Sequence, residues 1–228
     1  MKCCFTSYVY GVYQDYIPIF VYSVARAFPQ HVTKIFLKEK LNDKNKESLE
    51  LVRKFCDNFE VIDNFSDLDH YELPHGAANR YILTREYFDD CEYVYICDID
   101  FIIYNKYDNN FIDTYLRKCH NHNLPFSNYW RYDGRFRMGG IHFVIKNEYF
   151  DIIDKHIEEM KDKNCEFRTK HAGNPIKSYD EEMLYYMLFK AFNFRDLNER
   201  DNKIFNGLHL KAFRSSKIHD YDKSFYSS

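Results

Sequence analysis

The chain has 228 residues, of which 45% are hydrophobic, 19% aromatic and 29% charged. This composition excludes a disordered, collagen-like or coiled-coil protein, because the apolar side chains suffice to bury the core of one globular domain. With 32 basic and 35 acidic residues the net charge is −3, so no overall positive field would attract nucleic acid or an anionic membrane.

The seven cysteines are odd in number and show no Cys-x-x-Cys spacing. They are predicted to be reduced thiols of the core. The beginning of the sequence lacks an apolar segment followed by a cleavage site, and no apolar run reaches the about 18 residues that a membrane span needs. A cytoplasmic protein without a signal peptide or a transmembrane segment is therefore expected.

The first half alternates β-type and helical runs in the order βαβαβ. Strands are expected at 2–8, 33–38 and 59–63, and helices at 17–28 and 44–56. A helix at 78–88 and a densely apolar strand at 93–97 follow, and that strand has the composition of one covered on both faces. The pattern predicts an α/β domain with a central, mostly parallel sheet flanked by helices.

The second half is less regular. The expected elements are a helix at 110–119, a short strand near Phe126, a loop at 128–138, a strand at 141–145, a helix between 150 and 160, and a final helix at 180–192. The polar stretch 161–177 contains Gly173 and Pro175 and is predicted to be a mobile loop.

Asp98 and Asp100 follow the apolar strand at its carboxyl end. Ligands of open α/β sheets bind beyond the carboxyl ends of the strands, and residues two apart on an extended chain project to the same side. Both carboxylates can therefore converge while Ile99 points away. Two such oxygens suit Mg²⁺ or Mn²⁺ bound to a diphosphate, whereas the alternative is a pair of solvated acids at a strand end.

Several motifs accompany this pair in a fixed order. They are Phe5-Thr6-Ser7-Tyr8, Asn79-Arg80-Tyr81, Val94-Tyr95-Ile96-Cys97-Asp98-Ile99-Asp100, the strand from Met138-Gly139-Gly140 to Ile145, Asp180-Glu181-Glu182, and Asn206-Gly207-Leu208-His209. Together they resemble the metal-dependent nucleotide-sugar glycosyltransferases of the GT-A fold. The branch that they resemble most contains glycogenin and the bacterial lipooligosaccharide galactosyltransferases.

The resemblance implies one Rossmann-related domain over residues 1–228. Residues 1–104 would form its nucleotide-binding half, and 105–228 would bind the acceptor and close the metal and diphosphate site. The implied metal ligands are Asp98, Asp100 and His209, and an imidazole beside two carboxylates favours Mn²⁺ over Ca²⁺. A histidine in a loop is otherwise ordinary polar surface.

The donor contacts that the resemblance implies are Thr6, Tyr8, Arg80, Asp98, Ile99, Asp100, Gly140, Lys211 and Arg214. Arg80 would reach the donor or pair with Asp98 or Asp100. Lys211 and Arg214 would neutralise the leaving diphosphate, and the alternative for both is a solvated basic tail.

Asp180 and Glu181 are the implied catalytic residues, at the start of the final helix. One of them would contact the donor sugar or the acceptor hydroxyl, and in an inverting enzyme it would act as general base. N-capping and the helix dipole explain acids at this place equally well. Three departures from the family pattern are Glu181 in place of Gln, Met138 in place of Asn, and no Gly-x-x-Lys after His209.

The loop with the chain's one tryptophan is predicted to form the acceptor wall, through Trp130 and Asp133, because aromatic faces pack against sugar C–H groups. Trp130 as a core anchor is the alternative, and Arg135 and Arg137 are interpreted as solvated charges.

The expected function is metal-dependent transfer of a hexosyl or deoxyhexosyl group. The donor would be a nucleoside diphosphate sugar, with UDP as the family's commonest choice, and the acceptor a hydroxyl of a glycan or glycoprotein. There are three alternatives: a haloacid-dehalogenase-type phosphatase, whose motif normally lies near the N-terminus, a nucleotidyltransferase, which needs a Gly-rich loop absent after the first strand, and a degenerate carbohydrate-binding domain.

Overall fold

The structure is a computed structural model. It describes residues 1–73, 76–105, 111–132, 135–172, 178–194 and 207–210.

Six strands form the central sheet in the order β3-β2-β1-β4-β9-β6. Their bounds are β1 Cys3–Val9, β2 Val32–Leu37, β3 Phe59–Ile62, β4 Tyr93–Ile96, β6 Phe126–Ser127 and β9 His142–Ile145. β1 to β4 are parallel, whereas β9 is antiparallel to β4 and β6. Every residue of β1 and β4 is buried, as expected of central strands. The predicted mostly parallel sheet is confirmed.

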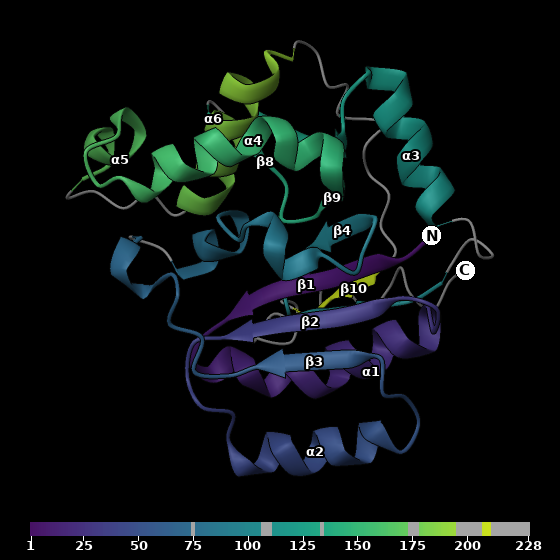
Figure 1. Cartoon of the computed structure of the whole chain (residues 1–228). Coiled ribbons are helices and arrows are strands. Elements are labelled where there is room, and N and C mark those ends of the chain that lie inside the picture. The colour runs from purple at the N-terminus through teal and green to yellow at the C-terminus, as the bar shows by residue number, and fades with distance from the viewer. Residues whose placement is uncertain (74–75, 106–110, 133–134, 173–177, 195–206, 211–228) are drawn as a thin grey trace, which may run out of the picture.

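Helices cover both faces of this sheet, and Figure 1 shows α1 and α2 on one side of β1–β3 and α4 and α6 on the other. The bounds are α1 Ile17–Ala27, α2 Asp43–Arg53, α3 Phe111–His122, α4 Lys146–Lys161 and α6 Tyr179–Phe192. One core cluster joins α1, α2 and α3 to the sheet, and a second joins α4 and α6 to the opposite face. Asn42 caps α2, since its side chain accepts a hydrogen bond from the Asn45 N–H at 2.8 Å.

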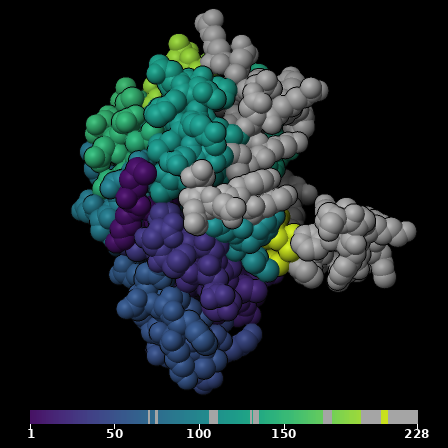
Figure 2. All heavy atoms as spheres, turned by 90° about the vertical axis from the view of Figure 1, so that its right-hand side faces the viewer, coloured from purple at the N-terminus to yellow at the C-terminus, as the bar shows by residue number. Residues whose placement is uncertain are grey.

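A short ribbon outside the main sheet joins distant parts of the chain. β10 (Gly207–His209) pairs antiparallel with β5 (Phe101–Ile103), which places His209 opposite Phe101. A Cβ on Gly207 would lie 2.8 Å from the carbonyl oxygen of Ile102, so the two strands approach closely only because position 207 is glycine. Figure 2 shows β10 in yellow at the surface of the molecule.

The prediction of one continuous helix at 78–88 is wrong. The chain forms two 3₁₀ helices instead, η3 (Gly76–Tyr81) and η4 (Arg85–Phe88), which the extended Thr84 separates. η3 buries polar as well as apolar residues and contacts β1 and α6, so tertiary contacts determine its conformation rather than helical periodicity. A shorter 3₁₀ helix, η2 (Asp69–Tyr71), precedes it, and another, η1 (Gly11–Tyr16), precedes α1.

Two segments predicted as loops contain regular structure. In 128–138, β7 (Trp130–Tyr132) and β8 (Phe136–Met138) form an antiparallel hairpin. Aromatic residues alternate with arginines there around Asp133-Gly134, a hairpin signal that the prediction missed. In 161–177, α5 (Glu166–Lys170) forms because Phe167 is buried against Tyr179.

All seven cysteines are free thiols, and six of them are buried, as predicted. Within the described part of the chain, no helix combines the length and apolar character needed to cross a membrane.

Candidate metal and donor site

The acid pair lies where the sequence predicts it. After β4 ends at Ile96, the Cys97 N–H donates to the carbonyl of Thr6 at 3.1 Å, which extends the pairing with β1 up to the first acid. The Asp100 side chain is 5% exposed and that of Asp98 is 31% exposed. One carboxylate is therefore embedded in the protein, and the other faces the solvent side of the site.

His209 completes a group of three possible ligands. Its Nε2 lies 3.1 Å from Asp100 Oδ1 and 4.0 Å from Asp98 Oδ2, and one ligating atom of each residue falls within 4.8 Å of the others. The imidazole stacks on Phe101 at 4.6 Å, and the Leu210 N–H donates to the Asp100 carbonyl at 2.7 Å. The β5–β10 ribbon thus brings together the three residues predicted as metal ligands.

The donor atoms fit a divalent metal ion. Two carboxylate oxygens and one imidazole nitrogen match the preferences of first-row divalent metals.

Arg80 links the acid pair to α6. Its Nη1 lies 2.5 Å from Asp98 Oδ1 and its Nη2 2.9 Å from Asp180 Oδ2, and its side chain is 4% exposed. Burial disfavours the charged guanidinium, but the charges of Asp98, Tyr81 and Asp180 outweigh that effect and raise the pKa of Arg80. Of the alternatives for Arg80, the structure shows the ion pair with Asp98.

Gly140 lies directly beside Asp98. A Cβ at position 140 would be 2.7 Å from Asp98 Oδ2, closer than a side chain tolerates. The turn before β9 therefore packs against the acid pair only because it carries glycine.

The predicted donor residues of β1 lie on the face that η3 covers. Thr6 is fully buried, and its Oγ1 has no hydrogen-bond partner among the described residues. Tyr8 is 3% exposed, and burial raises its pKa to about 12. Ile99 is also buried, between the two acids.

Tyr10 is a candidate for this site that the sequence analysis did not single out. Burial raises its pKa most, the charges of Tyr13, Asp180 and Asp98 raise it further, and that of Arg80 lowers it. The available signal was its position two residues after Tyr8, because alternate residues of a strand share one face.

The start of α6 carries acids in two different roles. Asp180 pairs with Arg80, whereas Glu181 accepts from Arg131 Nη1 at 2.9 Å and from Arg137 Nη1 at 2.7 Å. Burial raises the pKa of Glu181, against the lowering effect of both arginines. Ser178 is the N-cap of α6, and its side chain makes no capping hydrogen bond. Asp180 and Glu181 follow the cap position, and their carboxylates bind arginines.

The interpretation of Arg137 as a solvated charge is wrong, whereas Arg135 is 44% exposed and also pairs with an acid. Arg137 binds Glu181, and Arg135 Nη1 lies 2.8 Å from Glu182 Oε1. Together with Arg131 these residues fasten the β7–β8 hairpin to α6. The partners are about 45 residues apart in sequence, so local charge pattern could not reveal them.

Four predicted residues are not placed. Asp133, Lys211 and Arg214 lie outside the described residues, and of Trp130 only the backbone, at the start of β7, is described.

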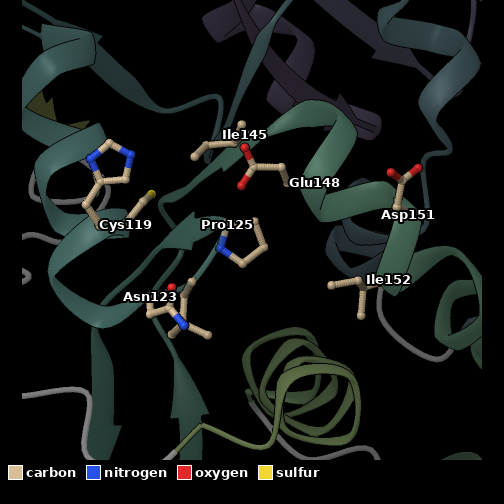
Figure 3. A pocket seen from close by; sticks show the side chains of 9 residues that line it. Cys119, Asn123, Pro125, Ile145, Glu148, Asp151 and Ile152 are labelled. Carbon is tan, nitrogen blue, oxygen red and sulfur yellow. The ribbon is translucent and has the colours of Figure 1, made fainter.

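A separate cavity lies far from the acid pair. Its volume is about 380 Å³, and it opens between the end of α3 and the start of α4, where Cys119, Pro125, Ile145 and Glu148 are among its lining residues (Figure 3). Ile145 pairs with Tyr93 at the amino end of β4, whereas Asp98 follows the carboxyl end. The cavity and the acid pair therefore lie at opposite ends of the sheet.

No family model matches the sequence, and no curated protein matches it at significant similarity. Solved structures do match. The galactosyltransferase LgtC, in complex with donor and acceptor sugar analogues, aligns with a TM-score of 0.51 and 15% identity over 89% of this chain and 82% of its own.

An active-site mutant of LgtC, in which a glutamate replaces a glutamine, aligns with a TM-score of 0.50 and 14% identity over 90% of this chain and 84% of its own. The apo form of the glycosyltransferase GlyE of Streptococcus pneumoniae TIGR4 aligns with a TM-score of 0.50 and 11% identity over 88% of this chain and 46% of its own. At this level of identity the likeness establishes architecture, and the chain has the GT-A fold of these glycosyltransferases, with an Asp-x-Asp group at the carboxyl end of the fourth strand.

Proposed function

We propose that this protein is a metal-dependent glycosyltransferase. It transfers a hexosyl or deoxyhexosyl group from a nucleoside diphosphate sugar, with uridine as the base, to a hydroxyl of a glycan or glycoprotein. The observation that carries the proposal is the convergence of Asp98, Asp100 and His209 at the edge of the sheet where open α/β folds bind ligands.

The metal would be Mn²⁺ or Mg²⁺, held by Asp98, Asp100 and His209, and the imidazole ligand favours Mn²⁺. A divalent ion supplies positive charge that stabilises the departing diphosphate. Lys211 and Arg214 would add further positive charge beside the same leaving group.

The donor would lie along the side chains around the acid pair. Thr6 Oγ1 is a buried hydroxyl with no partner among the described residues, and Tyr8 lies two positions along the same strand face. Ile99 and Gly140 would contact the donor through backbone, because Ile99 is buried and position 140 has no side chain. Arg80 orients Asp98 while it holds Asp180 on the other side.

In this proposal, Asp180 and Glu181 have different roles at the start of α6. Arg80 donates to Oδ2 of Asp180, so Oδ1 would accept a hydrogen bond from a sugar hydroxyl or take the acceptor proton. Arg131 and Arg137 engage both oxygens of Glu181, so this residue positions the hairpin that carries Trp130 and Asp133. The hairpin would then form the acceptor wall.

Thermal unfolding with a panel of nucleoside diphosphates, each with and without Mn²⁺, tests the proposal. We expect UDP to stabilise the protein only with Mn²⁺, by about 2.7 kcal/mol at a concentration 100 times Kd. Asp100→Asn should abolish this effect, and the exposed Asp57→Asn should retain it. Stabilisation by no diphosphate, or hydrolysis of a phosphomonoester, would contradict the proposal.

A further inference from the structure

One buried amide, that of Asn128, holds the turn that leads into β9. Asn128 follows β6 directly and is 4% exposed. Its Oδ1 accepts from the N–H of Tyr129 at 2.6 Å and from the N–H of Gly139 at 3.0 Å. Its Nδ2 donates to the carbonyl of Gly139 at 3.2 Å and lies 3.2 Å from His142 Nδ1. One side chain thus binds both polar groups of Gly139.

These partners define the orientation of the amide. Both neighbours of Oδ1 are N–H donors, and the Gly139 carbonyl next to Nδ2 can only accept. His142 Nδ1 must therefore accept as well, which puts the imidazole proton on Nε2. Burial lowers the pKa of His142 to about 3, in agreement with a neutral ring. Because all four positions of the amide are used, Asn128 has no group left to contact a substrate.

The turn that Asn128 holds is the one that touches Asp98. The peptide between residues 139 and 140 is trans and planar, so a carbonyl of Gly139 directed at Asn128 leaves the Gly140 N–H pointing the opposite way. The Tyr129 ring covers Gly139 so closely that a Cβ there would lie 2.0 Å from the ring. Gly140 in turn lies under the Asp98 carboxylate, where a Cβ would be 2.7 Å from Oδ2.

We propose that Asn128 is a positioning residue of the metal site. It fixes the Gly139–Gly140 peptide, that peptide forms the wall against which the Asp98 carboxylate rests, and Arg80 holds the same carboxylate from the other side. The inference rests on the proposed function, because it concerns the metal group assigned there. Groups that orient metal ligands without binding the metal typically contribute 10- to 100-fold to affinity.

Mn²⁺ titration followed by electron paramagnetic resonance tests this role in the whole chain. Two variants remove the hydrogen bonds of the Asn128 amide in different ways. Asn128→Ala deletes the amide, whereas Asn128→Asp keeps its shape but places an oxygen against the Gly139 carbonyl and His142 Nδ1. We expect each folded variant to bind Mn²⁺ about tenfold more weakly than the wild type.

Asn58→Ala is the matched control. The Asn58 amide also donates to two backbone carbonyls, those of Pro29 and His31, but it precedes β3 at the amino edge of the sheet. This control should lose stability and keep the wild-type Mn²⁺ affinity. Affinity within twofold of the wild type in both Asn128 variants would overturn the proposal.

A second measurement separates this inference from the proposed function. In the metal-free protein, the amide NMR signals of Asp98, Gly139 and Gly140 should shift in both Asn128 variants and stay in place in Asn58→Ala. If the wild type bound no metal, the proposed function would fail, and these signals alone would decide whether Asn128 positions Asp98. Unchanged Asp98 and Gly140 signals would then reject the positioning role.

Discussion

Two groups of charges lie close together at the start of α6, and they differ in balance. In the first, Asp98 and Asp180 share the guanidinium of Arg80, and Asp100 lies beside His209. In the second, Glu181 and Glu182 meet Arg131, Arg135 and Arg137. Two carboxylates that share one guanidinium can still bind a further cation, whereas two glutamates that meet three arginines have no such capacity and hold two elements together. The first group therefore fits the proposed metal site, whereas the second holds the β7–β8 hairpin against α6.

Removal of Arg80 should have the largest effect on stability. Arg80→Met leaves the carboxylates of Asp98 and Asp180 without their shared partner, and breaking a buried ion pair on one side costs about 3–5 kcal/mol. In the second group, Arg131→Met should lower the free energy of unfolding by about 1 kcal/mol or less, because Arg131 is 39% exposed and Glu181 keeps its bond to Arg137. Urea unfolding of both variants measures the difference. Equal losses would remove the distinction between the two groups.

Asp100→Asn should have the largest effect on activity. The amide preserves size but removes a charged ligand, so we expect kcat/KM for donor turnover to fall about 1,000-fold, or about 4 kcal/mol. The fold should persist, as circular dichroism would show. Glu181→Gln should retain most of the activity, since it loses only part of the contact with the hairpin. If Glu181→Gln lost more activity than Asp100→Asn, the catalytic role would belong to the glutamate and arginine group instead.

Gly140→Ala should act on metal binding more than on stability. The new methyl group meets Asp98 Oδ2 at 2.7 Å, and the carboxylate must move. We expect about tenfold weaker Mn²⁺ binding, at a cost in stability of about 1 kcal/mol. Gly11→Ala is the matched control, because Gly11 has φ +57° but open space around it. It should lose similar stability and bind Mn²⁺ normally; equal binding in both variants would count against contact between Gly140 and Asp98.

The smallest effect concerns pH. Burial raises the pKa of Glu181 in the folded protein, so the folded state binds more protons than the unfolded state between the unfolded value near 4.5 and the raised value. Stability from this group must therefore fall as pH rises through that interval. Relative to Glu181→Gln, the wild type should gain stability on acidification through the same interval. The opposite slope in urea unfolding at several pH values would show that the arginines outweigh burial.

The sequence could predict the elements whose pattern is local. The βαβαβ order and the acid pair after β4 follow from apolar periodicity and from the position of acids at a strand end. The helix at 78–88 failed because contacts with β1 and α6 select 3₁₀ turns there, and Thr84 is extended.

Contacts between distant residues required the structure. His209 was expected near Asp100 only through the resemblance, since 109 residues separate them. Tertiary geometry, which no spacing in the sequence encodes, likewise determines the ion pairs of Arg135 and Arg137 and the placement of Tyr10. The same holds for the hydrogen bonds of Asn128 to Gly139. Lys211, Arg214, Trp130 and Asp133 stay predictions.

The most direct test of the charge comparison is the stoichiometry of Mn²⁺ binding. It would be measured by isothermal titration calorimetry on the wild type, on Asp98→Asn with Asp100→Asn, and on Glu181→Gln with Glu182→Gln. The account predicts one site in the wild type, its loss in the first double variant and its retention in the second. A site that survives the loss of both aspartates, or disappears with the two glutamates, would contradict the account.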